Sequence, residues 1–297
     1  MKNRTTLTGI GLAVLATFIW SGNFIVARKI IKDIPPVTLS FYRWLTASII
    51  ILPFAWKYLR AEFSTIKKHL PYFLATGATG VSMFNTFVYI GGHYSEAINL
   101  ALIGTTSSPI ISVILARIFL KEQIGVYKIA GMFVCITGIL LLLSKGHLEN
   151  LLSLSFSKGD LWVLAAAFSF SVYNTLVKKK PAAVHPVSFL FVVFSLGTLI
   201  LVPFYIQEYN REGGFAISVT NISVILYLGI GASVICFLVW NKAISKLGAG
   251  RTALFGNLIP VFSSLEAVLI LHETISWIHI VSFALVITGL IIANYRK

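Results

Sequence analysis

The sequence predicts an all-α integral membrane protein whose ten transmembrane helices form two inverted five-helix repeats. Three observations predict this fold: an excess of apolar residues, ten apolar runs of membrane-spanning length, and a similarity between the two halves of the chain. Of the 297 residues, 57% are hydrophobic and 11% are charged, whereas about a quarter of a typical globular domain is charged. The charges cluster between the apolar runs, as expected of a chain that crosses a bilayer repeatedly.

The distribution of basic residues argues against binding to nucleic acid. The net charge is +14, but a nucleic-acid-binding protein collects such charge on a water-exposed face or tail. Here the basic residues lie at the ends of apolar runs, where the orientation preference of membrane proteins explains them. We therefore expect the lipid bilayer, and no nucleic acid, as a partner.

Each of the ten apolar runs is about 17 to 24 residues long, which at about 1.5 Å per residue spans a hydrocarbon core of about 30 Å. The runs cover residues 7–27, 37–55, 72–91, 97–120, 126–143, 161–177, 187–206, 222–240, 253–271 and 275–293. The first run follows Lys2 and Arg4, as in a signal peptide, but it lacks a good small-residue cleavage site. We therefore expect it to be retained as the first helix.

The positions of Lys and Arg predict the orientation of the chain. If the amino terminus is cytoplasmic, seventeen of the 24 Lys and Arg residues fall inside, six fall outside, and Arg43 falls within the membrane. Because basic residues concentrate on the cytoplasmic side, we expect a multi-pass protein of the cell membrane with both termini in the cytoplasm.

The second half of the chain repeats the first at an offset of 150 residues, which becomes 151 after one insertion. Matched pairs are Gly9 and Gly159, Pro36 and Pro186, Pro53 and Pro203, Pro109 and Pro260, Glu122 and Glu273, and Gly138 and Gly289. Since each repeat holds an odd number of spans, residues 1–150 and 151–297 must have opposite orientations. In many secondary transporters, such inverted halves enclose a substrate site near the midplane of the membrane.

These repeated residues resemble a known family. A Pro in the fourth and ninth spans is followed by a Glu thirteen residues later and by a Gly sixteen residues beyond that. This pattern, and the sequence Trp20-Ser21-Gly22-Asn23-Phe24 in the first span, resembles the EamA-like repeats of the drug/metabolite transporter superfamily. The resemblance covers nearly the whole chain. The second half departs from it at Phe170 and Ser282, so symmetry assigns no role to those two positions.

The resemblance implies a carrier that exports or exchanges small organic metabolites, such as amino acids, by alternating access around a central cavity. It does not identify the solute. An uptake or exchange carrier for nucleosides, sugars or cationic drugs is the alternative within the transporter class.

Two charged residues within predicted spans lack a charged counterpart in the other repeat. Glu266 corresponds to Leu115, and Arg43 corresponds to Val193. A charge near the bilayer centre costs about 2.5 to 3.5 kcal/mol on insertion scales, so each residue needs a partner or a function. We hypothesise that Glu266 exchanges a proton, the candidate coupling ion, or contacts an amine, and that Arg43 holds a substrate carboxylate. Alternatively, the two residues pair with each other, or Arg43 extends to the outer interface.

Pro109 and Pro260 each remove a helical hydrogen bond and free the carbonyl group four residues earlier. We therefore expect helix breaks at these positions. The surrounding residues are small and polar, which makes Thr106 and Asn257 candidates for lining a substrate cavity. The alternative is a pair of kinks that serve packing alone.

Glu122 and Glu273 lie where one span ends and the next begins. A carboxylate before the first turn of the fifth or tenth helix would be stabilised by the helix dipole, and the alternative is a gate with Lys121 or His272. Trp20 and Asn23 offer an aromatic face and an amide, which suit an organic solute in a mostly apolar pocket. The amide could instead form only a hydrogen bond between helices.

Other classes of protein have less support in the sequence. The phosphate-binding motif of ATP-driven pumps is absent, so we expect transport to be driven by a gradient. His272-Glu273 begins like a zinc-protease motif, but Ser276 occupies the position of the second His. We therefore expect no metal, no cofactor and no enzymatic activity. A membrane-embedded enzyme and a receptor are the non-transport alternatives, and the sequence leaves the oligomeric state open.

Overall fold

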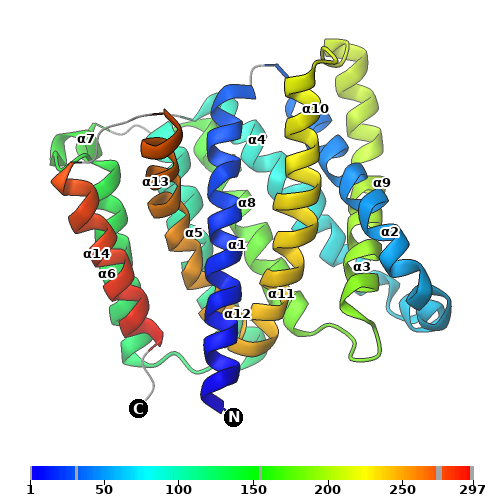
Figure 1. Ribbon diagram of the computed structural model, residues 1–297, viewed down its shortest axis with the longest axis horizontal. Helices are drawn as coiled ribbons and strands as arrows, with labels where there is room; N and C mark the ends of the chain where they lie inside the picture. Colours follow the sequence, from blue (N-terminus) through cyan, green and yellow to red (C-terminus); the bar gives the residue numbers. More distant parts are fainter. Residues whose placement is uncertain (1, 31–32, 96, 154–155, 272–275, 295–297) are drawn as a thin grey trace.

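The computed structural model describes residues 2–30, 33–95, 97–153, 156–271 and 276–294. All the regular structure in these residues is helical (Figure 1). The first repeat contains α1 (Lys2–Ile30), α2 (Pro36–Lys68), α3 (Leu70–Gly77), η1 (Ala78–Met83), α4 (Phe84–Tyr94), α5 (Ala97–Leu120) and α6 (Val126–Leu143). After the short α7 (Leu148–Leu152), the second contains α8 (Lys158–Lys178), α9 (Pro186–Glu212), α10 (Val219–Leu226), η2 (Tyr227–Ile235), α11 (Cys236–Leu247), α12 (Ala249–Ala253), η3 (Leu254–Leu258), α13 (Ile259–Leu271) and α14 (Trp277–Asn294).

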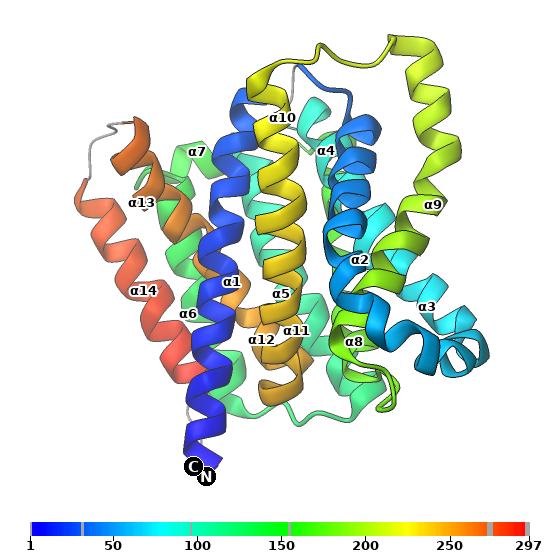
Figure 2. The same cartoon turned by 45° about the vertical axis from the view of Figure 1, so that its right-hand side comes forward.

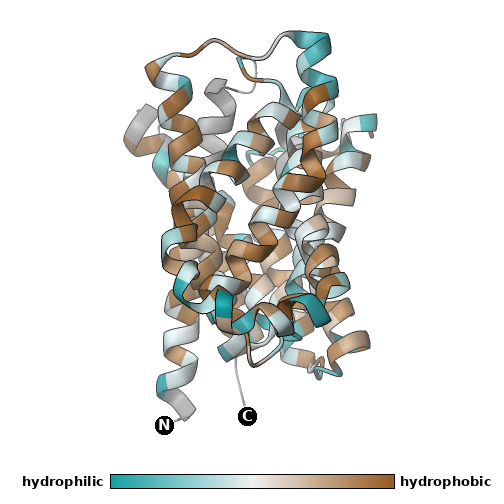
Figure 3. Cartoon of the chain, turned by 90° about the vertical axis from the view of Figure 1, so that its right-hand side faces the viewer, coloured by the Kyte–Doolittle hydropathy of each residue, from teal (hydrophilic) through white to brown (hydrophobic). Residues whose placement is uncertain are grey.

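Within the described ranges, nine helical segments are long and apolar enough to cross a membrane. They correspond to nine of the ten predicted runs. The remaining run, residues 253–271, is divided among α12, η3 and α13, none of which reaches that length alone. Hydrophobic residues cover the middle of the molecule and hydrophilic residues gather toward its ends (Figure 3), as expected for an integral membrane protein.

The two predicted helix breaks differ in the structure. The 3₁₀ segment η3 ends at Leu258, two residues before Pro260, and interrupts the helix there, whereas α5 continues through Pro109 as a single helix. The prediction of a break at Pro109 is therefore wrong. A proline inside a membrane helix can be accommodated when neighbouring groups satisfy the freed backbone atoms.

The inverted relation between the repeats is visible where α2 and α9 cross (Figure 2). Each helix has its N-terminus capped by a glutamate near the C-terminal end of the other. The Glu208 carboxylate accepts hydrogen bonds from Val37 N at 3.1 Å and Thr38 N at 2.6 Å, and Glu62 accepts one from His185 N at 2.9 Å. A carboxylate at a helix N-terminus is favoured by the helix dipole, so these reciprocal caps help to hold the repeats in opposite directions.

The third span of each repeat contains a π-helical segment at equivalent positions, η1 in the first repeat and η2 in the second. Such segments alter the backbone hydrogen-bond pattern and often lie at functional sites. Both segments pack toward the interface between the repeats, η1 against α8 and α9, and η2 against α1 and α2.

The fifth spans of the two repeats, α6 and α14, lie side by side at one edge of the molecule (Figures 1 and 2). They approach closely because glycines occupy the contact: a Cβ atom on Gly131 would overlap the carbonyl oxygen of Gly289. Small residues commonly permit such close packing between membrane helices.

Candidate functional site

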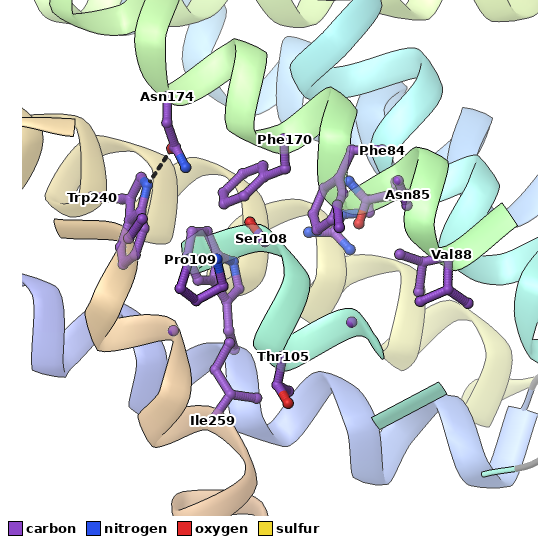
Figure 4. Close-up of a pocket in the computed structure, with 18 residues that line it drawn as sticks. Phe84, Asn85, Val88, Thr105, Ser108, Pro109, Phe170, Asn174, Trp240 and Ile259 are labelled. Carbon is purple, nitrogen blue, oxygen red and sulfur yellow. Dashed lines mark hydrogen bonds between the residues drawn. The ribbon is translucent and has the colours of Figure 1, made fainter. Parts of the chain in front are cut away.

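A cavity of about 100 Å³ lies between the two repeats, near the middle of the bundle. Both repeats line it, which agrees with a site enclosed by inverted halves. The lining residues include Trp20, Arg43, Phe84, Asn85, Thr105, Ser108, Pro109, Val163, Phe170, Asn174, Trp240, Gly256 and Ile259 (Figure 4). Most of them are apolar or aromatic, with a small number of polar groups that could orient a solute.

Among the described residues that line the cavity, Arg43 is the one with a charged side chain. Its side chain is only 1% exposed. The guanidinium group donates from Nε to Ser233 Oγ at 2.8 Å, from Nη1 to Tyr89 Oη at 2.9 Å, and from Nη2 to the Ala232 carbonyl at 3.1 Å. All three acceptors are neutral, so the positive charge is hydrogen-bonded but has no counter-charge among them.

Neither alternative for Arg43 is present in the structure. Among the described residues, no carboxylate lies within 4.0 Å of the guanidinium group, so Arg43 does not pair with Glu266. The side chain also does not extend to the outer interface, because it is buried between α2, α4 and η2. Two of the five guanidinium N–H groups have no acceptor within the described residues.

Asn85, on α4, adds a second polar group to the cavity. The residue is 4% exposed, and its Nδ2 atom has no hydrogen-bond partner in the described part of the chain. Figure 4 shows Asn85 and Phe84 on the opposite side of the cavity from Trp240. A buried amide without a partner is costly, which indicates that a ligand or water completes its hydrogen bonding.

Aromatic side chains form the other wall of the cavity. The ring centroids of Trp20 and Trp240 are 5.0 Å apart, and those of Trp20 and Phe170 are 5.8 Å apart. Trp240 Nε1 donates to Asn174 Oδ1 at 2.9 Å, and Trp20 Nε1 donates to the Ala232 carbonyl at 2.8 Å. Because both indole N–H groups have protein acceptors, these rings offer only their apolar faces to a solute.

The Ala232 carbonyl thus accepts hydrogen bonds from both Arg43 and Trp20. It lies in the π segment η2. The altered hydrogen-bond pattern of this segment places one carbonyl where it connects α1, α2 and the third span of the second repeat.

Glu266 lies outside the cavity, on α13 where this helix packs against α1. Its Oε1 atom is 2.7 Å from Ser21 Oγ, and its Oε2 atom is buried without a hydrogen-bond partner in the described residues. The nearby Tyr227 hydroxyl donates to the Ile19 carbonyl at 2.6 Å. This hydroxyl occupies the space that a Cβ atom on Gly22 would need.

The other candidate residues from the sequence are distributed differently. Trp20 and Pro109 line the cavity, whereas Thr106, Asn257 and Pro260 do not. Asn257 is 1% exposed, and neither polar atom of its amide has a hydrogen-bond partner in the described residues. The side chain of Asn23 and all of Glu273 lie outside the part of the chain that the structure describes.

Glu122 contacts a second helix in addition to the one expected. Its Oε1 atom accepts a hydrogen bond from Ala249 N at 2.9 Å, at the start of α12. Its Oε2 atom is 4.0 Å from Lys128 Nζ. The carboxylate therefore joins the loop before α6 to the ninth span, and it does not cap the first turn of α6.

Comparisons with known proteins agree with this architecture. The EamA-like transporter family matches the chain twice, over residues 7–144 and 157–295. The chain is 24% identical over 291 residues to a probable amino-acid metabolite efflux pump of Salmonella typhimurium, which covers 95% of this chain and 93% of that protein. It is 26% identical over 271 residues to an S-adenosylmethionine uptake transporter of Rickettsia felis, with 91% and 86% covered.

A solved crystal structure of a protein 17% identical in sequence has the same fold, with a TM-score of 0.79 over 99% of this chain and 97% of that chain. The two matches to the family cover both five-helix repeats, which together enclose the cavity. The chain therefore belongs to the EamA-like transporter family, and it is a multi-pass membrane transporter.

Proposed function

We propose that the protein is a secondary transporter that exports small carboxylate-bearing metabolites, such as amino acids, from the cytoplasm. The observation that carries this proposal is the Arg43 guanidinium group, which lines the cavity with no carboxylate within 4.0 Å in the described residues. A buried cation without a counter-charge is costly. A substrate carboxylate supplies that charge and matches the fork of N–H donors.

Asn85 supports the same class of substrate. Its unpartnered Nδ2 lines the same cavity as the guanidinium group and is a further N–H donor. The apolar faces of Trp20 and Trp240 suit the rest of a small organic solute.

The size and charge of the cavity argue against the cationic-drug alternative. A volume of about 100 Å³ is smaller than the roughly 300 to 1,000 Å³ of pockets for drug-sized ligands. The positive charge of Arg43 also repels a cation, and this repulsion is strong where the side chain is shielded from water.

In the proposed cycle, residues 1–150 and 151–297 move relative to each other and expose the cavity to one side of the plasma membrane at a time. Both termini lie in the cytoplasm, because this orientation places most Lys and Arg residues inside. An ion gradient drives transport, and we propose the proton as the coupling ion. The cycle includes no enzymatic step.

Uptake of a nucleoside-like metabolite is the second candidate function, and it requires the cavity of about 100 Å³ to widen during the transport cycle. The Trp20 and Trp240 rings, with centroids 5.0 Å apart, provide a stacking surface for a base, and one similar protein is named as an uptake transporter for S-adenosylmethionine. Competition by adenosine-bearing compounds, with no effect of amino acids, would favour this candidate.

Solute counterflow in proteoliposomes tests the proposal. Vesicles loaded with unlabelled amino acids should accumulate the corresponding labelled amino acid, and the decarboxylated amine of that amino acid should compete at least tenfold more weakly. Arg43→Gln should reduce counterflow by at least tenfold. The matched control is Arg60→Gln, because Arg60 lies on the same helix but is exposed, and it should transport normally. Normal carboxylate transport by the Arg43 variant would refute the proposal.

A further inference from the structure

Glu266 holds a carboxyl group between two helices, apart from the substrate cavity. It projects from α13 toward Ser21 on α1, and it is not among the residues that line the cavity. One carboxyl oxygen contacts Ser21 Oγ, and the other is buried with no hydrogen-bond partner among the described residues. Binding of a substrate carboxylate by Arg43 does not involve this second oxygen, and no hydrogen bond between the described helices involves it either.

The hydrogen bonds around Ser21 determine where a proton lies. Ser21 Oγ is 2.5 Å from the Phe18 carbonyl oxygen and 2.7 Å from Glu266 Oε1. A serine hydroxyl has one hydrogen, and a carbonyl oxygen cannot donate. If the hydroxyl donates to Phe18, the second short contact becomes a full hydrogen bond when Glu266 carries a hydrogen and donates it to Ser21 Oγ. A protonated carboxyl group gives each contact its own hydrogen, whereas an ionised one has to share the single serine hydrogen with the Phe18 carbonyl.

The surroundings of Glu266 provide no positive charge that would favour its ionised form. The described titratable side chains on the elements around it are Tyr227 on η2, Arg117 on α5, His279 on α14 and Arg4 near the start of α1. No cation in the described residues lies within 4.0 Å of the carboxyl group. The Tyr227 hydroxyl, which like Glu266 lies near Gly22, donates to the Ile19 carbonyl.

Helix α1 connects this carboxyl group to the substrate cavity. Ser21 contacts Glu266, and the adjacent Trp20 lines the cavity and donates to the Ala232 carbonyl. The same carbonyl accepts a hydrogen bond from Arg43. A change in the contact between α1 and α13 therefore reaches the guanidinium group through two adjacent residues of α1, Ser21 and Trp20, and one shared carbonyl.

We infer that Glu266 is the proton-binding site of the transporter, and that the contact between α1 and α13 forms when this carboxyl group is protonated. On deprotonation, the Phe18 carbonyl and the carboxylate share the single Ser21 hydrogen, so the contact weakens and α1 is released. One proton binds to the carboxylate and one leaves the carboxylic acid in each cycle, with no other bond formed or broken. This inference rests on the proposed function, because it names the ion that drives the solute movement.

Proton flux in proteoliposomes tests the inference. With a pH-sensitive dye trapped inside, solute movement through the wild-type protein should move protons in the opposite direction. Glu266→Gln should abolish both this proton flux and pH-driven accumulation, while it keeps counterflow within about threefold of wild type, because the Gln amide imitates the protonated acid. The matched control is Glu149→Gln, an exposed carboxylate on α7, which should leave both activities unchanged.

The outcomes separate this inference from the proposed function. If wild-type protein catalyses counterflow but moves no protons, the inference fails and the proposed function stands. Failure of counterflow for every carboxylate solute would instead refute the proposed function. If Glu266→Gln does not fold, Ser21→Ala provides the test: removal of the hydroxyl group should shift the pH dependence of flux while counterflow at a fixed pH persists. An unchanged pH profile in that variant would contradict the inference.

Discussion

Substitution of Ser233 by Ala tests how the cavity holds its guanidinium group. Ser233 Oγ accepts the Arg43 Nε hydrogen at 2.8 Å, and the Ser233 side chain is completely buried. Loss of a hydrogen bond to a charged group costs about 1.5 to 3 kcal/mol. Since the bonds to Tyr89 and Ala232 remain, we expect the lower end of this range. Where Arg43 must regain its orientation to bind substrate, this cost appears in substrate affinity, which at about 1.4 kcal/mol per factor of ten should fall about tenfold.

The assay is the concentration dependence of counterflow, with the half-saturation concentration as the main readout. Ser188→Ala is the matched control, because Ser188 is equally buried but its hydroxyl group has no partner in the described residues. Tyr89→Phe removes a second acceptor of the same guanidinium group, so its effect should not add fully to that of Ser233→Ala. An unchanged half-saturation concentration in Ser233→Ala, with normal folding, would refute the role assigned to the Arg43 contacts.

Two further predictions concern the packing of the repeats, and thermal unfolding in detergent measures both. Glu208→Ala removes two cap hydrogen bonds and should lower the free energy of unfolding by about 1 to 2 kcal/mol. Glu62→Ala removes one cap hydrogen bond and should lower it less. The control is Glu212→Ala, because Glu212 is exposed, and equal effects at all three positions would contradict the role of the caps. Gly131→Ala, which forces α6 away from α14, should cost about 1 to 3 kcal/mol. The control is Gly11→Ala, where the added Cβ atom meets nothing within 4 Å, and it should be neutral or stabilising. Equal destabilisation by both glycine substitutions would contradict the close contact between α6 and α14.

Much of the fold could be predicted from the sequence because its determinants are local. Apolar runs of membrane-spanning length require helices in lipid, and the repeated Pro and Glu residues identify the duplication. The divided ninth span was harder to predict, since Pro109 and Pro260 have equivalent sequence positions but only the second follows a 3₁₀ segment. Packing of neighbouring helices decides whether a proline interrupts a membrane helix.

The site was predicted only in part. Arg43 stood out because its counterpart in the other repeat is apolar, and the structure places it in the cavity lining. The same reasoning selected Glu266, which lies at a separate contact. Ser233 and the Ala232 carbonyl were missed, because their roles depend on the π segment η2. The position of a π segment depends on tertiary packing, and small residues such as Gly229 and Gly231 are only a weak signal of it.

Binding of matched ligands to the purified protein tests most directly whether Arg43 recognises a substrate carboxylate. Calorimetric titration would compare a transported amino acid with its decarboxylated amine, in the wild-type protein and in Arg43→Gln. The wild-type protein should prefer the carboxylate-bearing ligand by at least tenfold, and the variant should lose that preference while it still binds the amine. A variant that retains the full preference for the carboxylate would contradict the proposed role of Arg43.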